Sequence, residues 1–210
     1  MKNLPNDRPV RLGVLLSGRG SNFLAIAKNI QEGRLSGVEI AVVIANLPEA
    51  KGLDEANKLG LPTALFASKG RKRAEHDADV TACLREHGVD LVILAGYMRL
   101  LSPEFITAFR DRILNIHPSL LPAFPGLDAQ TQAFEYGAKV AGCTVHFVDE
   151  KLDHGTITLQ RVVPVLDADD AHALAERILV EEHIAYSEAI GRVVSGRYQI
   201  AGRRFVPISA

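Results

Sequence analysis

Apolar runs alternate with amphipathic segments through the first two thirds of the chain, and this feature constrains the fold most. Strands are expected at 10–16, 38–44, 63–66 and 91–94, and helices at 22–32, 53–59 and about 73–87. Strands this apolar are typical of a parallel sheet that crossover helices cover on both faces. The alternation therefore predicts a doubly wound α/β fold with a mostly parallel sheet.

The pattern changes in the last third of the chain. A short buried strand is expected at 113–116, and two longer apolar runs follow at 141–148 and 156–165. The connection DEKLDHG is too short for a crossover helix, so these two strands should pair antiparallel. A long helix at about 171–194 precedes SGRYQI and RRFVPI, a candidate terminal hairpin. With no repeat or linker, one domain over 1–210 is expected.

Composition excludes several classes of protein. The 210 residues are 47% apolar and 23% charged with a net charge of −1, so no overall charge favours nucleic acid or an anionic membrane. No apolar run approaches the roughly 18 residues of a membrane helix, and the start lacks a signal-peptide core. Cys83 and Cys143 are far apart without CxxC spacing, which predicts buried free thiols and a cytoplasmic location.

The stretch LLSGRGSN leads from a strand through a glycine-rich turn into a helix. Such a turn directs backbone N–H groups and a helix dipole at one spot, which favours a phosphate. Gly18 and Gly20 allow the turn, while Ser21 or Asn22 can cap the helix or donate to the anion. The third glycine of a dinucleotide fingerprint is absent, and Asn46 replaces the expected acid. One phosphate group is predicted, with an ordinary capped turn as the alternative.

Three further patterns bear on the chemistry: a basic run, the spacing of the histidines and the absence of a serine elbow. The run SKGRKR at 68–73 is a solvated charge cluster or a second phosphate contact, since Arg73 begins a helix near the carboxyl end of a strand. The seven histidines are scattered, without HxxxH or HExxH spacing, so no metal site is expected. No GxSxG elbow supports a nucleophilic serine.

The stretch LNIHPSLLP ends a strand with two polar groups. Asn115 and His117 are two apart and should face the same side, and Pro118 stops the strand. A lone histidine beside apolar residues is usually a core residue. An amide and an imidazole together can instead act on one carbonyl, one as oxyanion donor and one as proton carrier. In KLDHGT, Asp153 and Gly155 are by default turn residues.

Together, GRGSN, YMRLLSP, NIHPSLLP, GCTVHFVDEKLDHG and EEH resemble the folate-dependent formyltransferase family, from Arg11 to about Arg197. GRGSN favours the members that act on glycinamide ribonucleotide. The resemblance implies a formyltransferase fold, with the substrate bound by the N-terminal half and the folate loop in the C-terminal half. It implies transfer of the formyl group of 10-formyltetrahydrofolate to the amine of N1-(5-phospho-D-ribosyl)glycinamide in purine biosynthesis.

The resemblance also assigns roles to single residues. The catalytic triad would be Asn115, His117 and Asp153. The residues expected at the substrate phosphate and ribose are Gly20, Ser21, Asn22, Arg73 and Glu182. The residues expected at the folate are Arg73, Met98, Arg99, Leu100, Leu101, Asn115, Asp149 and Asp153. The loop at 149–154 would close over the pterin.

Three positions depart from the family pattern. Ala123 and Asp128 stand where some members carry lysine and histidine. Thr156 makes LDHGT where LDxGP is frequent. The missing proline leaves the loop beside Asp153 looser, although the acid is kept.

Four other functions stay open at this point. A hydrolase of the same family would split formylfolate with the same three residues, but it usually carries an N-terminal regulatory domain and needs no phosphate turn. A member that formylates methionyl-tRNA would carry a large C-terminal extension. A non-catalytic phosphoribosyl-binding module would keep the glycine turn alone, and a nicotinamide oxidoreductase would need the missing fingerprint. The expected partners are small molecules, not nucleic acid or membrane, and a homodimer is left open.

Overall fold

A computed structural model describes residues 4–208 of the chain. The chain divides into two compact units, the first ending at Leu114 and the second beginning at Asn115. The division falls inside strand β5 (Ile113–His117), which carries both polar residues of the LNIHPSLLP stretch. The expectation of a single domain therefore stays a prediction.

The first unit is built on four parallel strands in the order β3-β2-β1-β4. These strands are β1 (Val10–Leu16), β2 (Val38–Ala45), β3 (Thr63–Leu65) and β4 (Leu91–Leu94). In the middle of the sheet, Val14 pairs with Val43 on one side and Ile93 on the other. Nearly every residue of these central strands is buried, as their continuous apolar sequences predicted.

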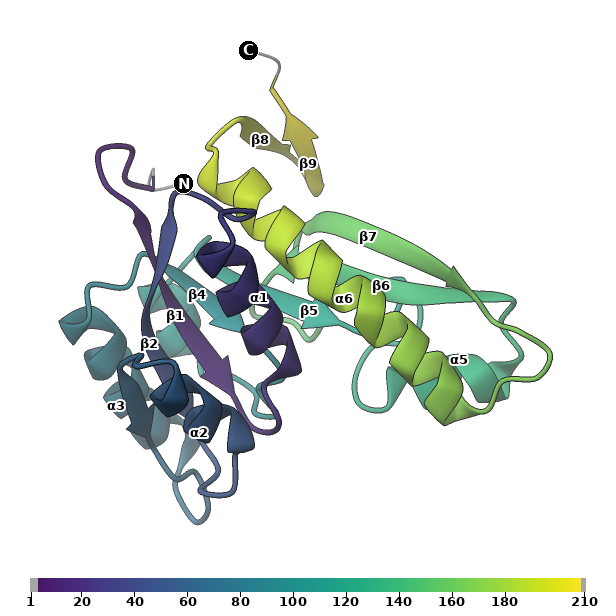
Figure 1. The fold of residues 1–210 in the computed structure, drawn as a ribbon, viewed down its shortest axis with the longest axis horizontal. Helices are drawn as coiled ribbons and strands as arrows, with labels where there is room; N and C mark the ends of the chain where they lie inside the picture. The colour runs from purple at the N-terminus through teal and green to yellow at the C-terminus, as the bar shows by residue number, and fades with distance from the viewer. Residues whose placement is uncertain (1–3, 209–210) are drawn as a thin grey trace. The chain divides into compact units, whose positions relative to one another are not determined.

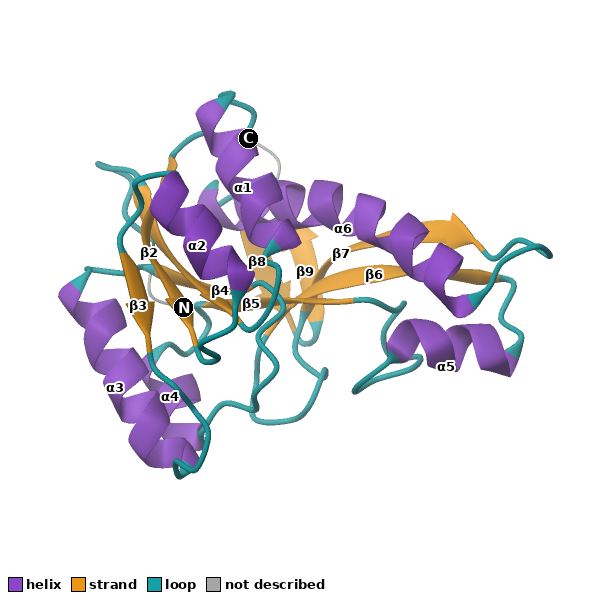
Figure 2. Cartoon of the chain, turned by 60° about the horizontal axis from the view of Figure 1, so that its bottom comes forward, coloured by secondary structure: helices purple, strands orange, loops and turns teal. Residues whose placement is uncertain are grey.

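Helices cover both faces of this sheet. The helices of the first unit are α1 (Ser21–Gln31), α2 (Lys51–Lys58), α3 (Arg73–Glu86) and α4 (Pro103–Ala108). Figure 2 shows α1 and α2 on one face and α3 and α4 on the opposite face. Parallel strands joined in this way have all their carboxyl ends at one edge, so the loops that follow β1, β2, β3 and β4 emerge together.

The core of the first unit explains one glycine in a strand. Phe23 and Ile26 of α1 and Leu84 of α3 are completely buried. A side chain at Gly13 would overlap Leu84, so the glycine lets α3 approach the sheet closely. Burying each such large side chain contributes about 1.5–3 kcal/mol of hydrophobic free energy.

The second unit pairs its strands in the order β6-β7-β9-β8. The strands are β6 (Val140–Phe147), β7 (Ile157–Pro164), β8 (Tyr198–Ala201) and β9 (Arg204–Pro207). The predicted antiparallel pair β6–β7 and the terminal hairpin β8–β9 are both confirmed. One feature was not predicted, a short parallel pairing of β9 with the start of β7 at Ile157 and Arg204.

Two helices complete the second unit. Helix α6 (Ala171–Val194) lies along β6 and β7 (Figure 1), and α5 (Ala129–Tyr136) packs against α6. The bounds of α6 are those the sequence indicated, and Asp170 caps it by accepting the Ala173 N–H at 2.7 Å. No helix within residues 4–208 has both the length and the apolar character to cross a bilayer. The fold class, a mostly parallel sheet with an antiparallel C-terminal pair, is confirmed.

Candidate active site

Four polar side chains gather at the end of β5 in the second unit. Asn115 Nδ2 lies 3.2 Å from His146 Nε2, and His117 Nδ1 lies 3.5 Å from Asp153 Oδ2. The cluster closes through His146 Nε2 and Asp153 Oδ1, which are 3.8 Å apart. The sequence predicted that Asn115, His117 and Asp153 come together, and they do. His146 was not predicted.

His146 fixes the orientation of the Asn115 amide. Its Nδ1 lies 2.8 Å from the carbonyl oxygen of Phe147, an atom that only accepts, so Nδ1 carries the proton. Nε2 is then the acceptor, and the amide must present its NH₂ group to it. Burial lowers the pKa of His146 and so favours the neutral ring that this arrangement needs. One N–H of Asn115 bonds to His146, and the second stays available.

His117 is held in a similar way from the loop that follows β5. Its Nε2 lies 2.9 Å from the carbonyl oxygen of Phe124, so Nε2 is the protonated nitrogen. Nδ1 faces the carboxylate of Asp153, and the residue is only 5% exposed. A proton arriving at Nδ1 would therefore form an imidazolium beside a buried carboxylate, which stabilises the charge.

Asp153 combines a special backbone with a buried side chain. Its φ angle is 47°, in the left-handed region that Asp and Asn tolerate better than other residues with side chains. Its Oδ2 accepts the Gly126 N–H at 2.8 Å, and its side chain is 8% exposed. This backbone conformation points the carboxylate inward from the β6–β7 loop to the histidines.

Gly155 lets the two ends of the β6–β7 loop meet. A side chain at this position would overlap the carbonyl oxygen of Phe147. The Phe147 N–H donates to the carbonyl of Thr156 at 2.9 Å, which closes the base of the loop. The glycine of the LDxG pattern is thus required by close backbone packing beside Asp153.

The glycine-rich turn of the first unit leads into α1 without a side-chain cap at the N-cap position. Gly20 is the N-cap residue, with φ 75°, and no side chain caps the helix. Ser21 and Asn22 are its first two residues, so the alternative in which one of them caps the helix is not seen. No acidic residue lies in the first turn, so its N–H groups and dipole can attract an anion.

Close backbone packing supports this turn. A Cβ at Gly20 would lie 2.9 Å from the Cα of Gly52 in α2. The Gly52 N–H donates to the carbonyl of Gly18 at 3.0 Å. The turn therefore rests directly on the start of the next helix, with no room for a side chain between them.

A buried polar network connects the loops at the carboxyl edge of the first unit. Ser17 Oγ donates to Asn46 Oδ1 at 2.6 Å, and Asn46 Nδ2 donates to Ser68 Oγ at 3.3 Å. Ser17 Oγ also accepts the Met98 N–H at 2.8 Å. The loop expected at the folate is thereby tied to the strand that leads into the phosphate turn. Sequence reasoning missed this role of Asn46 as a loop connector.

The residues expected at the folate wall divide by exposure. Met98 and Leu100 are 69% and 54% exposed, so their side chains are accessible to a ligand. Arg99 instead turns back and donates to the backbone carbonyls of Ser68 at 3.4 Å and Arg71 at 3.2 Å. Leu101 is half-buried.

The remaining predicted residues lie in different surroundings. Arg73 is exposed at the first position of α3, and its side chain forms no hydrogen bond or ion pair in the described part of the chain. Glu182 is buried on α6 of the second unit, and Asp149 lies at the start of the β6–β7 loop. Burial raises the pKa of the Cys143 thiol to about 12, and the Glu182 carboxylate adds to this shift. Among residues 4–208, no three His, Cys, Asp or Glu side chains are grouped to hold a metal ion.

Comparison with known proteins shows which family the chain and its fold resemble. The model of the formyl transferase family matches residues 10–190. The crystal structure of glycinamide ribonucleotide transformylase 1 from Symbiobacterium toebii is 49% identical, with a TM-score of 0.93 over 97% of this chain and 96% of that one. Phosphoribosylglycinamide formyltransferase of Bacillus subtilis is 39% identical over 185 residues, which span 88% of this chain and 94% of that protein.

The chain belongs to the formyl transferase family. The Bacillus subtilis relative, which this chain matches over most of the length of both proteins, is a phosphoribosylglycinamide formyltransferase. It is also 43% identical to part of the human trifunctional purine biosynthetic protein adenosine-3, and it spans only 14 to 19% of the length of such trifunctional relatives. A formyltetrahydrofolate deformylase from Pseudomonas syringae, 24% identical with a TM-score of 0.90, shares the fold.

Proposed function

We propose that this protein transfers the formyl group of 10-formyltetrahydrofolate to the amine of glycinamide ribonucleotide. The products are the N-formyl ribonucleotide and tetrahydrofolate, in a step of purine biosynthesis. The observation that carries this proposal is the cluster of Asn115, His117, His146 and Asp153 at the end of β5. It occurs in a chain that matches a glycinamide ribonucleotide transformylase over 97% of its length.

Asn115 supplies the oxyanion donor in this proposal. When the substrate amine attacks the formyl carbon, a C–N bond forms and negative charge develops on the formyl oxygen. The Asn115 N–H that is not bonded to His146 donates to this oxygen. The donor of His117 is already engaged by the Phe124 carbonyl, so the amide is the better placed of the two.

Asp153 and His117 handle the proton that the attacking amine must lose. The Asp153 carboxylate accepts this proton directly or through a water molecule. Nδ1 of His117, 3.5 Å from Asp153 Oδ2, can then share the proton with the carboxylate. The proton then passes to the folate nitrogen as its bond to the formyl carbon breaks. Protons and charge balance without a metal or an outside acid.

The substrate contacts are assigned from the resemblance. The start of α1, with Gly20, Ser21 and Asn22, is proposed for the phosphate, with Arg73 as a further cation and Glu182 for the ribose. The exposed apolar side chains of Met98 and Leu100, with Arg99 and Leu101 beside them, are proposed for the folate. Asp149 belongs to the same assignment, on the loop that carries Asp153.

We also propose the setting in which the enzyme works. The family model spans the division at Leu114, which supports one functional domain over both units. Cys83 and Cys143 are free and buried, which supports a reducing, cytoplasmic location. The partners are then the two small-molecule substrates, with a homodimer as an option.

An assay of formylfolate consumption with and without glycinamide ribonucleotide tests the function. A transferase consumes formylfolate only when the ribonucleotide is present and releases no formate. The deformylase likeness defines the rival, a hydrolase that releases formate in either case. Binding of both substrates without any turnover would instead identify a non-catalytic module.

A further inference from the structure

The β6–β7 loop, which carries Asp153, is contacted by the C-terminal hairpin at three places. At its beginning, the ring of Phe147 stacks on Tyr198, with centroids 6.3 Å apart, and Tyr198 stacks on Phe205 at 4.3 Å. At its end, β9 pairs with β7 through Ile157 and Arg204. Both ends of the loop are therefore held by the same hairpin.

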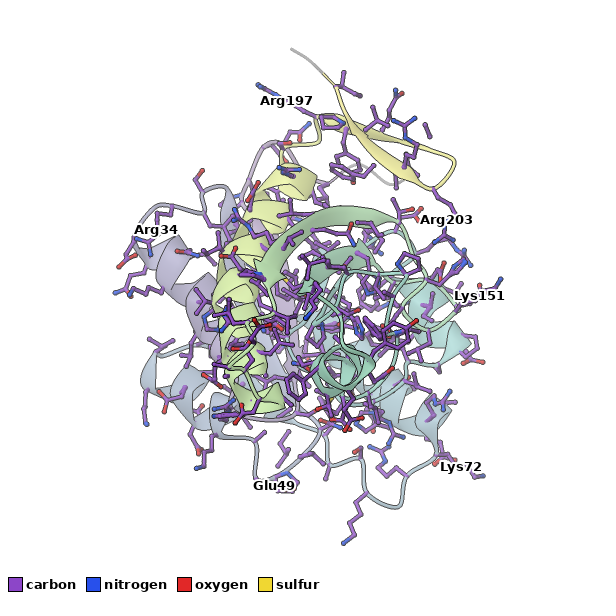
Figure 3. The ribbon with its side chains drawn as sticks, turned by 90° about the vertical axis from the view of Figure 1, so that its right-hand side faces the viewer. Arg34, Glu49, Lys72, Lys151, Arg197 and Arg203 are labelled. Atoms are coloured by element: carbon purple, nitrogen blue, oxygen red, sulfur yellow. The ribbon has the colours of Figure 1, made fainter. Side chains whose placement is uncertain are left out.

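The third contact is made by Arg203, in the turn of the hairpin. Its Nη1 lies 2.7 Å from His154 Nε2 and 3.1 Å from Nδ1, and its Nη2 donates to the His154 backbone carbonyl. His154 Nδ1 in turn lies 2.8 Å from Asp149 Oδ2. Figure 3 shows Arg203 at the hairpin on the same side of the second unit as Lys151 of the loop.

The proton positions along this chain follow from the partners. A guanidinium only donates and a carboxylate only accepts, so Nδ1 of His154 carries the proton and Nε2 accepts from Arg203. Burial acts to raise the pKa of Asp149, but hydrogen bonds from His154 and the Lys151 N–H outweigh it, and the pKa is lowered. Arg203, His154 and Asp149 thus form a chain of hydrogen bonds across the loop, in which Arg203 donates to His154 and His154 donates to Asp149.

We propose that the hairpin β8–β9 is a brace that sets the conformation of the loop, and that Arg203 is a positioning residue acting on Asp153 through His154. Because it assigns Asp153 a part in formyl transfer, the inference rests on the proposed function. His154 is the neighbour of Asp153, and its carbonyl and ring are both held by Arg203. The β6–β7 loop has Thr156 where a proline is frequent in the family, so it lacks the backbone restraint of that ring. The contacts of the hairpin provide a different restraint.

The test compares Arg203→Ala with Arg204→Ala in the full chain. Arg204 is the matched control, because it is the next residue, is also exposed, and pairs with β7 through its backbone. In Arg203→Ala, kcat/KM for formylfolate should fall about 3- to 10-fold, the factor that matches one or two exposed hydrogen bonds. The KM for glycinamide ribonucleotide and the melting temperature should stay unchanged.

Hydrogen exchange supplies a readout that does not depend on activity. The amides at 148–156 should exchange about 3- to 10-fold faster in Arg203→Ala and at the wild-type rate in Arg204→Ala. Arg203→Lys, which keeps one donor, should recover part of the protection. A double variant with His154→Ala should lose less than the sum of the two single losses, because the ring contacts are shared and only the bond from Arg203 to the carbonyl of residue 154 is left to lose.

The outcomes separate the two proposals. Equal exchange in the two arginine variants overturns the brace, whatever the enzyme does. Faster exchange in Arg203→Ala with no transfer activity in the wild-type protein supports the brace and overturns the proposed function. A rise in the KM of both substrates with a lowered melting temperature would mean general destabilisation and would also overturn the positioning role.

Discussion

Asn115 donates through Nδ2 to Nε2 of His146 across 3.2 Å, and this bond decides which way the amide faces. If the amide were reversed, its oxygen would meet the lone pair of Nε2, and its N–H groups would point away from the position proposed for the reacting carbonyl. His146 is itself set by the Phe147 carbonyl, so the orientation originates in the backbone of β6. The donor is thereby arranged before any substrate binds, which is the condition for effective electrostatic catalysis.

Replacing His146 tests this arrangement. His146→Phe keeps a ring of similar size but removes the acceptor, and we expect kcat to fall about 10-fold, the value of one orienting hydrogen bond. His146→Gln offers an oxygen acceptor and should recover part of the loss. Steady-state kinetics measure both, and equal losses in Phe and Gln variants would show that the acceptor has no role.

Removing the donor itself should cost more. Asn115→Ala is expected to lower kcat on the order of 100- to 1000-fold, as for other single oxyanion donors. Adding His146→Phe to Asn115→Ala should cause little further loss, because the histidine acts through the amide. Additive losses in this double variant would contradict a shared role.

Asp153→Asn separates the charge of this residue from its shape. Asparagine also tolerates the left-handed backbone and can accept the Gly126 N–H, so the fold should persist. Without a carboxylate to take the proton, kcat should fall about 100- to 10000-fold, while the KM values change little. A thermal melt checks that the fold persists, and pre-steady-state rates measure the loss of turnover. A variant that keeps near-wild-type turnover would show that Asp153 has no part in the mechanism.

Stability should depend on pH through two histidines. Burial lowers the pKa of His146 and of His183, whereas an unfolded histidine titrates near pH 6.5. Below about pH 6.5 the unfolded chain takes up protons that the folded chain resists, so the free energy of unfolding falls there and is level above. Urea unfolding at pH 5.5 and 7.5 measures the difference, and His183→Gln should reduce it.

Activity should fall for a separate reason at lower pH, once the pH drops below the lowered pKa of His146 in the folded protein. A proton on Nε2 of His146 would remove the acceptor that orients Asn115. Hydrogen bonds hold the pKa of carboxylates such as Asp90 and Asp149 below the usual range, so these groups do not account for a change in stability between pH 7.5 and 5.5. A free energy of unfolding that rose between pH 7.5 and 5.5 would contradict the assignment of these histidines.

Two glycines should respond differently to alanine. At Gly155 the new methyl group would overlap the Phe147 carbonyl, and we expect Gly155→Ala to destabilise the protein by about 2–4 kcal/mol. At Gly18 nothing lies within 4 Å of the added Cβ, so Gly18→Ala should change stability by less than about 1 kcal/mol. Chemical denaturation of both variants decides this, and equal losses would be inconsistent with the packing at the base of the loop.

The long helices and strands could be predicted from the sequence because the spacing of apolar residues in each one fits a single type of secondary structure. The bounds of β1 and α6 agree with the expected ranges, since continuous burial or a long amphipathic face leaves little ambiguity. Helix α4 was missed although Ser102 and Pro103 form a cap and a first-turn proline. Helix α5 gave no such signal, because its N-cap Asp128 is left-handed and makes no side-chain cap.

The residues of the candidate site could be predicted where they belong to a sequence motif. They could not be predicted where only the folded structure brings them to the site. Asn115, His117 and Asp153 lie in recognisable stretches, and the structure brings them together. His146 lies in the buried run GCTVHFV, where a histidine is expected to be a core residue, and only its contacts show otherwise. The pairing of β9 with β7 joins segments about fifty residues apart, which local patterns do not encode.

Residues 124–126 hold both proton-handling groups of the site. The Phe124 carbonyl accepts from His117, and the Gly126 N–H donates to Asp153. Both residues have positive φ angles, 52° and 86°, and Pro125 between them has little torsional freedom. The distance between Asp153 and His117 therefore depends on the backbone conformation of this one short segment. Any mutation or inhibitor that shifts residues 124–126 would displace His117 and Asp153 together, without contacting either side chain.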